Sequence, residues 1–274
     1  MFKIIKTELF DEFKCLMGAC KDNCCDENWL IIIDDATYEL YQSMGIENLD
    51  EKVTAQVPHS LIKKNGKCPF ITPEGLCILH RDMGEKYISN TCRSYPRFVS
   101  TYGDLYVENI GLSCPASADW IVSLSRKITL LEKVYYEDQS EVGKTLPASE
   151  DELRMKSIVD TFYRNDTLLE SVKDIEHIMD KKILDEQLTE ICSGDFVRNN
   201  ELLAQNIGIS FLFENLMLES LKTESDYAAV VGKSIRIIGA ISEKYSELAS
   251  SGRSVEENLS DAIYKTMRIE DHGI

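Results

Sequence analysis

The sequence of 274 residues lacks several features that assign a chain to a common class. No apolar run approaches the ~20 residues of a membrane-spanning helix. The N-terminus lacks the apolar segment and small-residue cleavage site of a secretory signal. Positive charge is not in excess either, because 47 acidic residues outweigh 30 basic ones and leave a net charge of −17. These absences predict a soluble, cytoplasmic protein that binds neither membrane nor nucleic acid.

Two cofactor motifs are also missing. No glycine-rich G-x-G-x-x-G loop follows a candidate strand, which argues against an ordinary Rossmann-type nucleotide site. No C-x2-C pair occurs, although structural zinc sites usually combine two such pairs. Cysteine itself is plentiful, and eight of the nine cysteines lie between residues 15 and 114. Their grouping is the most informative feature of the chain.

These eight thiols come from five segments and need a shared explanation. They are Cys15, Cys20, Cys24, Cys25, Cys68, Cys77, Cys92 and Cys114. Disulfides are typical of oxidising compartments, and a bond between the adjacent Cys24 and Cys25 would be strained. Burial as an apolar side chain explains the isolated Cys192 well, but it explains the close spacing of the first four cysteines poorly. Metal ligation by the eight thiols is therefore the favoured interpretation, with packing and disulfides as alternatives.

The kind of metal is less clear from the spacing. Thiolates suit zinc, copper(I) and iron–sulfur clusters. The pattern Cys15-x4-Cys20-x3-Cys24 lies near the plant-type cluster motif C-x4-C-x2-C without matching it. A [4Fe–4S] cluster is favoured, although these thiols could also ligate a [2Fe–2S] cluster. Zinc is the alternative. His80 follows Cys77 by three residues, and we expect a surface or supporting position for it.

Three residues around Cys92 are predicted to bind a cofactor. Arg93 and Arg97 can neutralise a thiolate site and donate hydrogen bonds to it, and Tyr95 lies between them. The same arginines could hold an anionic group of a ligand, such as a carboxylate. No catalytic residue is assigned.

The predicted fold is mostly α-helical with small irregular β elements. A cysteine-rich metal-binding domain is expected over residues 1–138, with a buried strand at Trp29–Ile33 and a helix from Asp34 to Met44. A further helix is predicted from Ser117 or Asp119 through Leu131. Residues 139–149 form a polar linker to an all-α domain over residues 139–274. Its predicted helices are 150–164, 166–182, 184–192, 195–222, 226–249 and 254–269, with Ser254 and Glu257 forming a capping box.

Several spaced motifs between about residues 10 and 125 occur together in one family. In order they are Phe13-x-Cys15-x2-Gly18-x-Cys20, Cys24-Cys25-x3-Trp29, Ile31-Ile-Ile33-Asp34 with Thr37-Tyr38, Cys68-Pro-Phe70, Cys77, Cys92-Arg-x-Tyr-Pro-Arg97 and Ser113-Cys114-Pro115. This arrangement resembles the flagellin lysine-N-methylase family, which belongs to a broader group with a cysteine-rich zinc- or iron-chelating domain.

The resemblance implies transfer of a methyl group from S-adenosylmethionine to lysine ε-amines of flagellin, by a protein that carries an iron–sulfur cluster. Flagellin or another lysine-presenting protein is then the expected partner. Methyl transfer needs a neutral, well-placed amine, and Tyr95, Tyr102, Asp34 and Glu108 are candidates to support it. The competing interpretation is a non-catalytic zinc- or iron-binding module that acts in metal handling or protein interaction.

Overall fold

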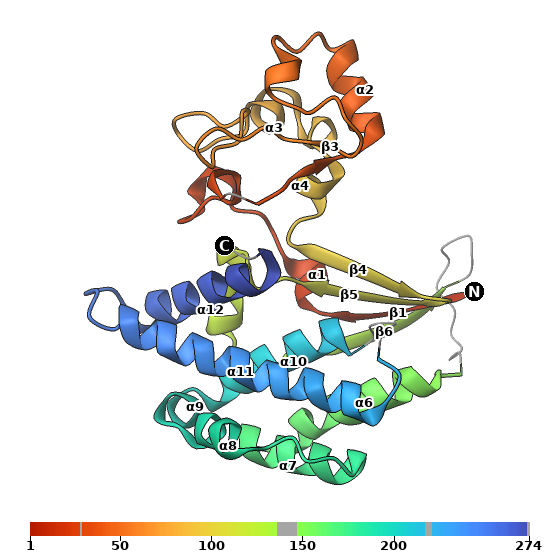
Figure 1. Cartoon of the computed structure of the whole chain (residues 1–274), viewed down its shortest axis with the longest axis vertical. Helices are drawn as coiled ribbons and strands as arrows, with labels where there is room; N and C mark the ends of the chain where they lie inside the picture. The colour runs from red at the N-terminus through yellow and green to blue at the C-terminus, as the bar shows by residue number, and fades with distance from the viewer. Residues whose placement is uncertain (28, 136–146, 217–220, 273–274) are drawn as a thin grey trace.

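The computed structural model describes residues 1–27, 29–135, 147–216 and 221–272. The chain forms two lobes, which Figure 1 shows one above the other. The small lobe comprises residues 14–96, and the large lobe comprises the remaining described residues. The boundary predicted at residues 138 and 139, and most of the predicted linker, lie outside the described residues.

A four-stranded sheet forms one side of the large lobe, with the strand order β4-β5-β1-β6. Its strands are β1 (Phe2–Thr7), β4 (Arg97–Tyr102), β5 (Leu105–Ile110) and β6 (Leu130–Tyr135). β1 is parallel to β5 and antiparallel to β6, so the first strand of the chain is central. β4 and β5 form a hairpin, and Gly103 at its turn has φ +59°, a conformation that glycine adopts without strain.

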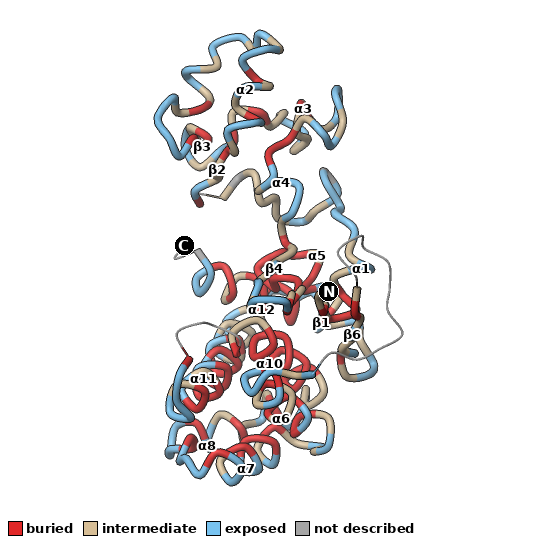
Figure 2. Tube along the Cα trace, turned by 90° about the vertical axis from the view of Figure 1, so that its right-hand side faces the viewer, coloured by how far each residue is buried: buried red, intermediate tan, exposed pale blue. Residues whose placement is uncertain are grey.

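Helices make up most of the remaining large lobe. They are α1 (Leu9–Glu12), α5 (Pro115–Ser123), α6 (Glu150–Arg164), α7 (Leu168–Met179), α8 (Glu186–Ser193), α9 (Asp195–Asn199), α10 (Glu201–Asn215), α11 (Glu224–Leu248) and α12 (Val255–His272). α10 is buried on all sides from Leu203 to Phe213 and occupies the centre of the lobe, as Figure 2 shows. The side chain of Asn109 on β5 donates to the carbonyl oxygen of Ser210 at 3.0 Å and so ties the sheet to this helix.

The small lobe is irregular. Its regular elements are α2 (Asp35–Ser43), α3 (Ile78–Met83), α4 (Asn90–Ser94) and a two-stranded sheet of β2 (Ile32–Ile33) and β3 (His59–Ser60). The expected strand at Trp29–Ile33 is thus reduced to two residues. Buried apolar side chains fall into two clusters, and the one in this lobe is small. The other joins the sheet to the C-terminal helices, with members such as Ile5, Val107, Phe162, Phe213 and Ile263.

The prediction of a mostly α-helical chain with small sheets is confirmed, and several local predictions hold in detail. The helix α6 has the predicted bounds of 150–164. The Asp34 carboxylate accepts a hydrogen bond from the backbone N–H of Thr37 at 3.0 Å, so it caps α2 as expected. Ser254 and Glu257 form the predicted capping box, with reciprocal hydrogen bonds of 2.9 and 3.1 Å at the start of α12.

Two helix predictions are wrong. The helix expected over 195–222 breaks at Asn200, whose backbone is not helical, into α9 and α10, and α10 ends at Asn215. The expected helix through Leu131 ends at Ser123, and the chain then turns into the strand β6, which the helical spacing of its apolar residues concealed. Distant side chains hold this turn: Asn206 accepts from the N–H of Ile128 at 2.9 Å, and Glu8 accepts from that of Thr129 at 3.0 Å. β1 was not predicted either. No helix within the described ranges is long and apolar enough to cross a membrane.

Glu214, near the end of α10, is a source of pH-dependent stability. Burial raises the pKa of its carboxyl to about 8, and the carboxylate of Asp271 on α12 adds to the effect. The folded protein therefore binds this proton more tightly than the unfolded chain does. The stability that Glu214 contributes is fully present below the ordinary carboxyl pKa of 4.5 and is lost as the pH rises through about 8.

We predict that Glu214→Gln reduces the fall in unfolding free energy between about pH 5 and about pH 8, because it removes the carboxyl that must ionise. The variant should be more stable than the wild type at the upper end of that range. Urea unfolding at several pH values measures this. Glu190→Gln, at an exposed position of α8, is the control and should keep the wild-type pH dependence. A Glu214→Gln curve parallel to the wild-type curve contradicts the assignment.

Candidate metal centre

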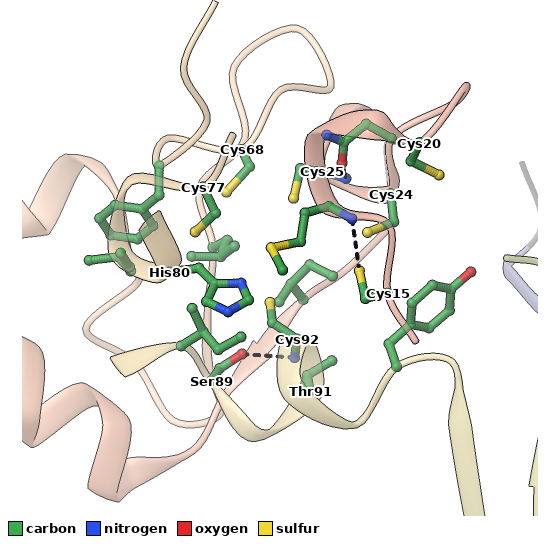
Figure 3. A pocket seen from close by; sticks show the side chains of 18 of the residues that line it. Cys15, Cys20, Cys24, Cys25, Cys68, Cys77, His80, Ser89, Thr91 and Cys92 are labelled. Carbon is green, nitrogen blue, oxygen red and sulfur yellow. Dashed lines mark hydrogen bonds between the residues drawn. The ribbon is translucent and has the colours of Figure 1, made fainter. Parts of the chain in front are cut away.

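A cavity of about 280 Å3 lies within the small lobe and extends to the first turn of α5. All eight cysteines between residues 15 and 114 line it, and Figure 3 shows seven of them around the cavity. Most of the other lining side chains are apolar or aromatic; they include Phe13, Trp29, Ile33, Tyr41, Phe70, Leu79 and Tyr95. Thiols from segments far apart in the sequence thus share one apolar enclosure.

Four of the thiols come from the stretch before Trp29. A single turn at Met17–Ala19 separates Cys15 from Cys20, and a second turn at Cys24–Asp26 carries the adjacent pair. We name residues Cys20–Glu27 the thiol loop. Asn23 fixes its second turn, because its amide oxygen accepts from the N–H of Cys25 at 2.9 Å and its amide nitrogen donates to the carbonyl of Gly75 at 2.8 Å.

The four remaining thiols sit at fixed points of the backbone. The N–H of Cys68 donates to the carbonyl of Cys25 at 2.9 Å, which joins the second segment to the thiol loop. Cys77 immediately precedes α3, and Cys114 immediately precedes α5 with proline at its first position. Cys92 lies in α4, where its N–H donates to the Ser89 hydroxyl that caps the helix, at 3.2 Å. Helix starts and tight turns therefore deliver these side chains.

All nine cysteines are free, so disulfides do not explain the arrangement. Burial raises the pKa of Cys92 to about 11 and that of Cys114 to about 12. The hydrogen bond with Cys25, helped by burial, raises the pKa of Cys24 well above its usual range. The bond with Cys24 lowers the pKa of Cys25, but the hydrogen bond with Cys68 and burial outweigh it and raise that pKa. These thiols are neutral near pH 7 in the absence of a cation.

The donor chemistry of the cavity fits a thiophilic metal. Neutral thiols lose their protons when a metal ion binds, and the ion then supplies the positive charge that stabilises the thiolates in a mostly apolar cavity. Within the described residues, no three side chains of the His, Cys, Asp or Glu type are close enough together to hold an ion as they stand. Metal binding would therefore have to draw thiols further together, and the turns that carry them decide how easily they move.

The three residues predicted to bind a cofactor have different positions. Tyr95 lines the cavity, and its hydroxyl donates to the Ser113 hydroxyl at 3.3 Å. Arg93 and Arg97 do not line it. The Arg93 guanidinium bonds the side chain of Asn90 at 2.9 Å, and that of Arg97 bonds the carbonyl of Phe13 at 2.8 Å. Arg97 thus ties β4 to the residues that follow α1, whereas Arg93 bonds within its own helix α4.

The other residues singled out in the sequence also differ in their distance from the cavity. His80 lines the cavity beside Cys77. Asp34 caps α2 and also accepts from the N–H of Asn90 at 3.0 Å; burial opposes its ionisation, but these hydrogen bonds lower its pKa, which makes it a poor base. Tyr102 and Glu108 belong to β4 and β5 and lie away from the cavity lining.

Two cationic side chains near the thiols, Lys63 and Arg268, were not predicted from the sequence. The ammonium of Lys63 lies 5.9 Å from the centre of the Trp29 ring and donates to the carbonyl of Glu27. Burial lowers its pKa. The guanidinium of Arg268 lies 5.5 Å from the centre of the same ring. Neither position stands beside a cysteine in the chain, so only the fold brings these charges to the site.

Three curated relatives match this chain. Lysine-N-methylase of Salmonella typhimurium and that of Salmonella choleraesuis are each 28% identical over 151 residues, which cover 50% of this chain and 37% of the relative. Flagellar biosynthetic protein FliU of Salmonella muenchen is 30% identical over 134 residues, which cover 44% of this chain and 78% of the relative. The matched region thus spans little more than a third of the length of the two lysine-N-methylases.

No family model matches the sequence, and no solved structure matches the fold. The link to known proteins therefore rests on the three sequence relatives. Of these, FliU is matched over more than two thirds of its length. The chain belongs to the flagellin lysine-N-methylase-like family.

Proposed function

We propose that this protein transfers methyl groups from S-adenosylmethionine to lysine ε-amines of flagellin and that the cavity thiols hold an iron–sulfur cluster. The observation that carries the proposal is the gathering of eight free thiols around one apolar cavity in a chain of this family. The names of the relatives, lysine-N-methylase and FliU, support a flagellar lysine substrate.

The proposed ligands are Cys15, Cys20, Cys24, Cys25, Cys68, Cys77, Cys92 and Cys114, which exceed the four thiolates that one [4Fe–4S] cluster needs. A bound cluster supplies one-electron chemistry, whereas zinc, the alternative, would supply structural stability. Binding of a metal by such a site contributes on the order of 10 kcal/mol to folding, as measured for zinc. The small lobe, with its small hydrophobic cluster, would benefit most from this contribution.

The residues of the chain have three tasks in the proposed reaction. An apolar lining favours the neutral form of an entering lysine amine, whose lone pair must attack the methyl carbon. As the nitrogen–carbon bond forms, the sulfonium–carbon bond breaks and S-adenosylhomocysteine leaves. The methylated amine carries the positive charge and gives its proton to water once it leaves the site. The aromatic walls formed by Trp29 and Tyr95 can align the amine with the methyl group and exclude bulk water.

A second candidate function is a non-catalytic metal-binding module that acts in metal handling or protein interaction. The observations in its favour are the same free cysteines and the lack of a glycine-rich G-x-G-x-x-G loop for a nucleotide cofactor in the sequence. Such a module would share the thiol cavity but need no site for a methyl donor.

We predict that anaerobically reconstituted protein transfers label from S-adenosylmethionine to flagellin lysines. Mass spectrometry of the digested flagellin measures the methylated ε-amines, and reconstituted protein without flagellin is the control. Label on lysine supports the enzyme. If the protein neither labels flagellin nor binds S-adenosylmethionine, the non-catalytic module is the correct function.

We also predict that Cys24→Ser, Cys25→Ser and Cys92→Ser each lower the metal content several-fold, because a hydroxyl is a poor ligand for a soft metal. Iron and zinc in anaerobically purified protein are measured by elemental analysis, which also decides between the two metals. Cys192→Ala is the control: Cys192 is buried among the helices of the large lobe, and its loss should leave the metal content unchanged. Equal metal content in all four variants contradicts the ligand assignment.

A further inference from the structure

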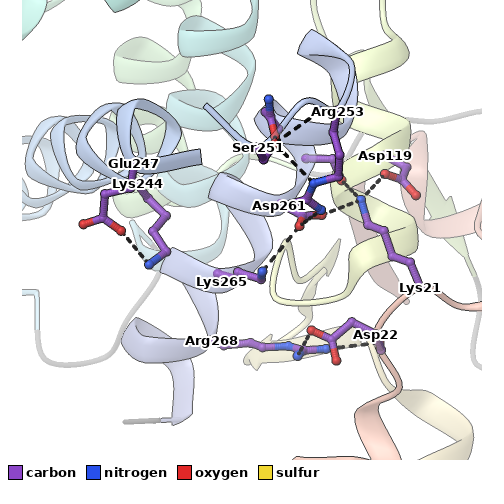
Figure 4. Close-up of polar contacts among 12 residues, drawn as sticks. Lys21, Asp22, Asp119, Lys244, Glu247, Ser251, Arg253, Asp261, Lys265 and Arg268 are labelled. Atoms are coloured by element: carbon purple, nitrogen blue, oxygen red, sulfur yellow. Dashed lines mark hydrogen bonds and ion pairs between the residues drawn. The ribbon is translucent and has the colours of Figure 1, made fainter. Parts of the chain in front are cut away.

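The last helix of the chain reaches the thiol loop. Along α12, Ser260, Asp261, Tyr264 and Arg268 follow one another at intervals of one, three and four residues, so they share one face of the helix. This face meets the thiol loop, as Figure 4 shows for Lys21, Asp22 and their partners. The contact joins segments that are about 240 residues apart in the chain.

Arg268 makes the central contact of this face. Its guanidinium donates to the Asp22 carboxylate at 3.0 Å and to the Glu27 carboxylate, which lie near the two ends of the thiol loop. It also donates to the carbonyl of Ser113 at 3.1 Å, directly before Cys114. The side chain is only 5% exposed. One buried arginine thus holds together two of the segments that bring thiols to the cavity.

Two aromatic rings lie against this guanidinium. The centre of the Tyr264 ring lies 4.8 Å from it and that of the Trp29 ring lies 5.5 Å from it. The planar guanidinium of arginine can contact aromatic rings and donate to several acceptors at the same time. The compact ammonium of lysine cannot do both. The position therefore depends on arginine by its geometry as well as by its charge.

In a second contact the cation belongs to the thiol loop and its acceptors belong to the large lobe. Lys21 of the thiol loop donates to the carboxylate of Asp119 on α5 at 2.8 Å and to the hydroxyl of Ser260 at 2.8 Å. Its ammonium lies 3.0 Å from the buried carboxylate of Asp261. Two cations therefore join the thiol loop to the large lobe: Arg268 of α12, which bonds carboxylates of the loop, and Lys21 of the loop, which bonds groups of α5 and α12.

The thiol loop has little regular structure of its own to keep its shape. Its bonds to the small lobe include those from Asn23 to Gly75 and from Cys68 to Cys25. The ammonium of Lys63, also in the small lobe, donates to the carbonyl of Glu27. The side-chain contacts of Lys21, Asp22 and the Glu27 carboxylate come from α5 and α12 of the large lobe. Removing them leaves Cys20 and Cys24 on a segment that is held from one side.

We propose that Arg268 is a positioning residue that holds the thiol loop, and with it Cys20 and Cys24, against the large lobe in the form that receives metal. The C-terminal helix thereby controls how tightly the metal is retained. The metal part of this inference rests on the proposed function, whereas the positioning of the loop does not. Arg268 acts through the loop and touches no reacting atom.

The first experiment measures metal retention. In anaerobically purified protein, Arg268→Met should release iron or zinc to a chelator faster than the wild type, because loss of a residue that supports metal ligands typically lowers metal affinity about 10- to 100-fold. Arg268→Lys should also release metal faster, because an ammonium cannot bond all three acceptors. Wild-type retention in Arg268→Lys overturns the positioning role, since charge alone would then suffice.

The second experiment needs no bound metal. Metal-free protein is treated with iodoacetamide, and mass spectrometry follows the alkylation rate of each cysteine. Arg268→Met should speed alkylation of Cys20 and Cys24 several-fold and leave buried Cys192 at its wild-type rate. Lys233→Met is the matched control, because it removes a cation that pairs with Glu270 of α12 and lies over Phe211, outside the thiol loop.

The outcomes separate the two proposals. If wild-type protein holds neither iron nor zinc, the metal proposal fails, and the alkylation rates still decide the role of Arg268. If Arg268→Met does not fold by circular dichroism, Asp22→Ala and Glu27→Ala break the same contact from the loop side and should give the same pattern. Unchanged alkylation at Cys20 and Cys24, or an equal increase at Cys192, overturns the inference.

Discussion

The structure depends on keeping eight free thiols around one apolar cavity. A buried thiol is tolerated as a small, weakly polar group while it stays protonated, and burial raises the pKa of Cys114 accordingly. The surrounding lobe has short elements and a small hydrophobic cluster. Lobes of this kind commonly depend on a metal or on disulfides for stability, and all the cysteines here are free.

The large lobe provides the rigid part of the molecule. Its buried cluster joins the four-stranded sheet to the C-terminal helices, so the N-terminal strand and the last helix belong to one packed unit. Figure 2 shows how burial concentrates there and thins out in the small lobe. The thiol cavity thus lies in the less densely packed lobe, close to a firm support from α5 and α12. This combination suits the proposed metal site, whose side chains would have to move on binding.

The thiol cavity has cations nearby although the protein as a whole is strongly acidic. The net charge is −17, yet the cations of Lys63 and Arg268 lie 5.9 and 5.5 Å from the centre of the Trp29 ring, beside the thiol loop. Both cations also bond Glu27, one through its carbonyl and one through its carboxylate. In partly buried surroundings such charges act over short distances and are weakly screened. They favour negative charge at the thiols without making the surface basic.

The sequence alone determined the features that arise from local chemistry. The grouping of the cysteines identified the cavity lining, and the motifs around them identified the family. The cap at Asp34 and the capping box of Ser254 and Glu257 were predictable because each needs only residues three apart in the chain. The helix α6 was predictable for the same reason, since its apolar face repeats within one segment.

Tertiary structure alone decided the rest. The segment after Ser123 became a turn and a strand because Asn206 and Glu8, distant in sequence, bond its backbone. Arg93 and Arg97 lie next to Cys92 in the chain but bond other groups, whereas Arg268 reaches the thiol loop from the far end. Such contacts depend on how helices and sheet pack, and no spacing between neighbours in the sequence encodes them.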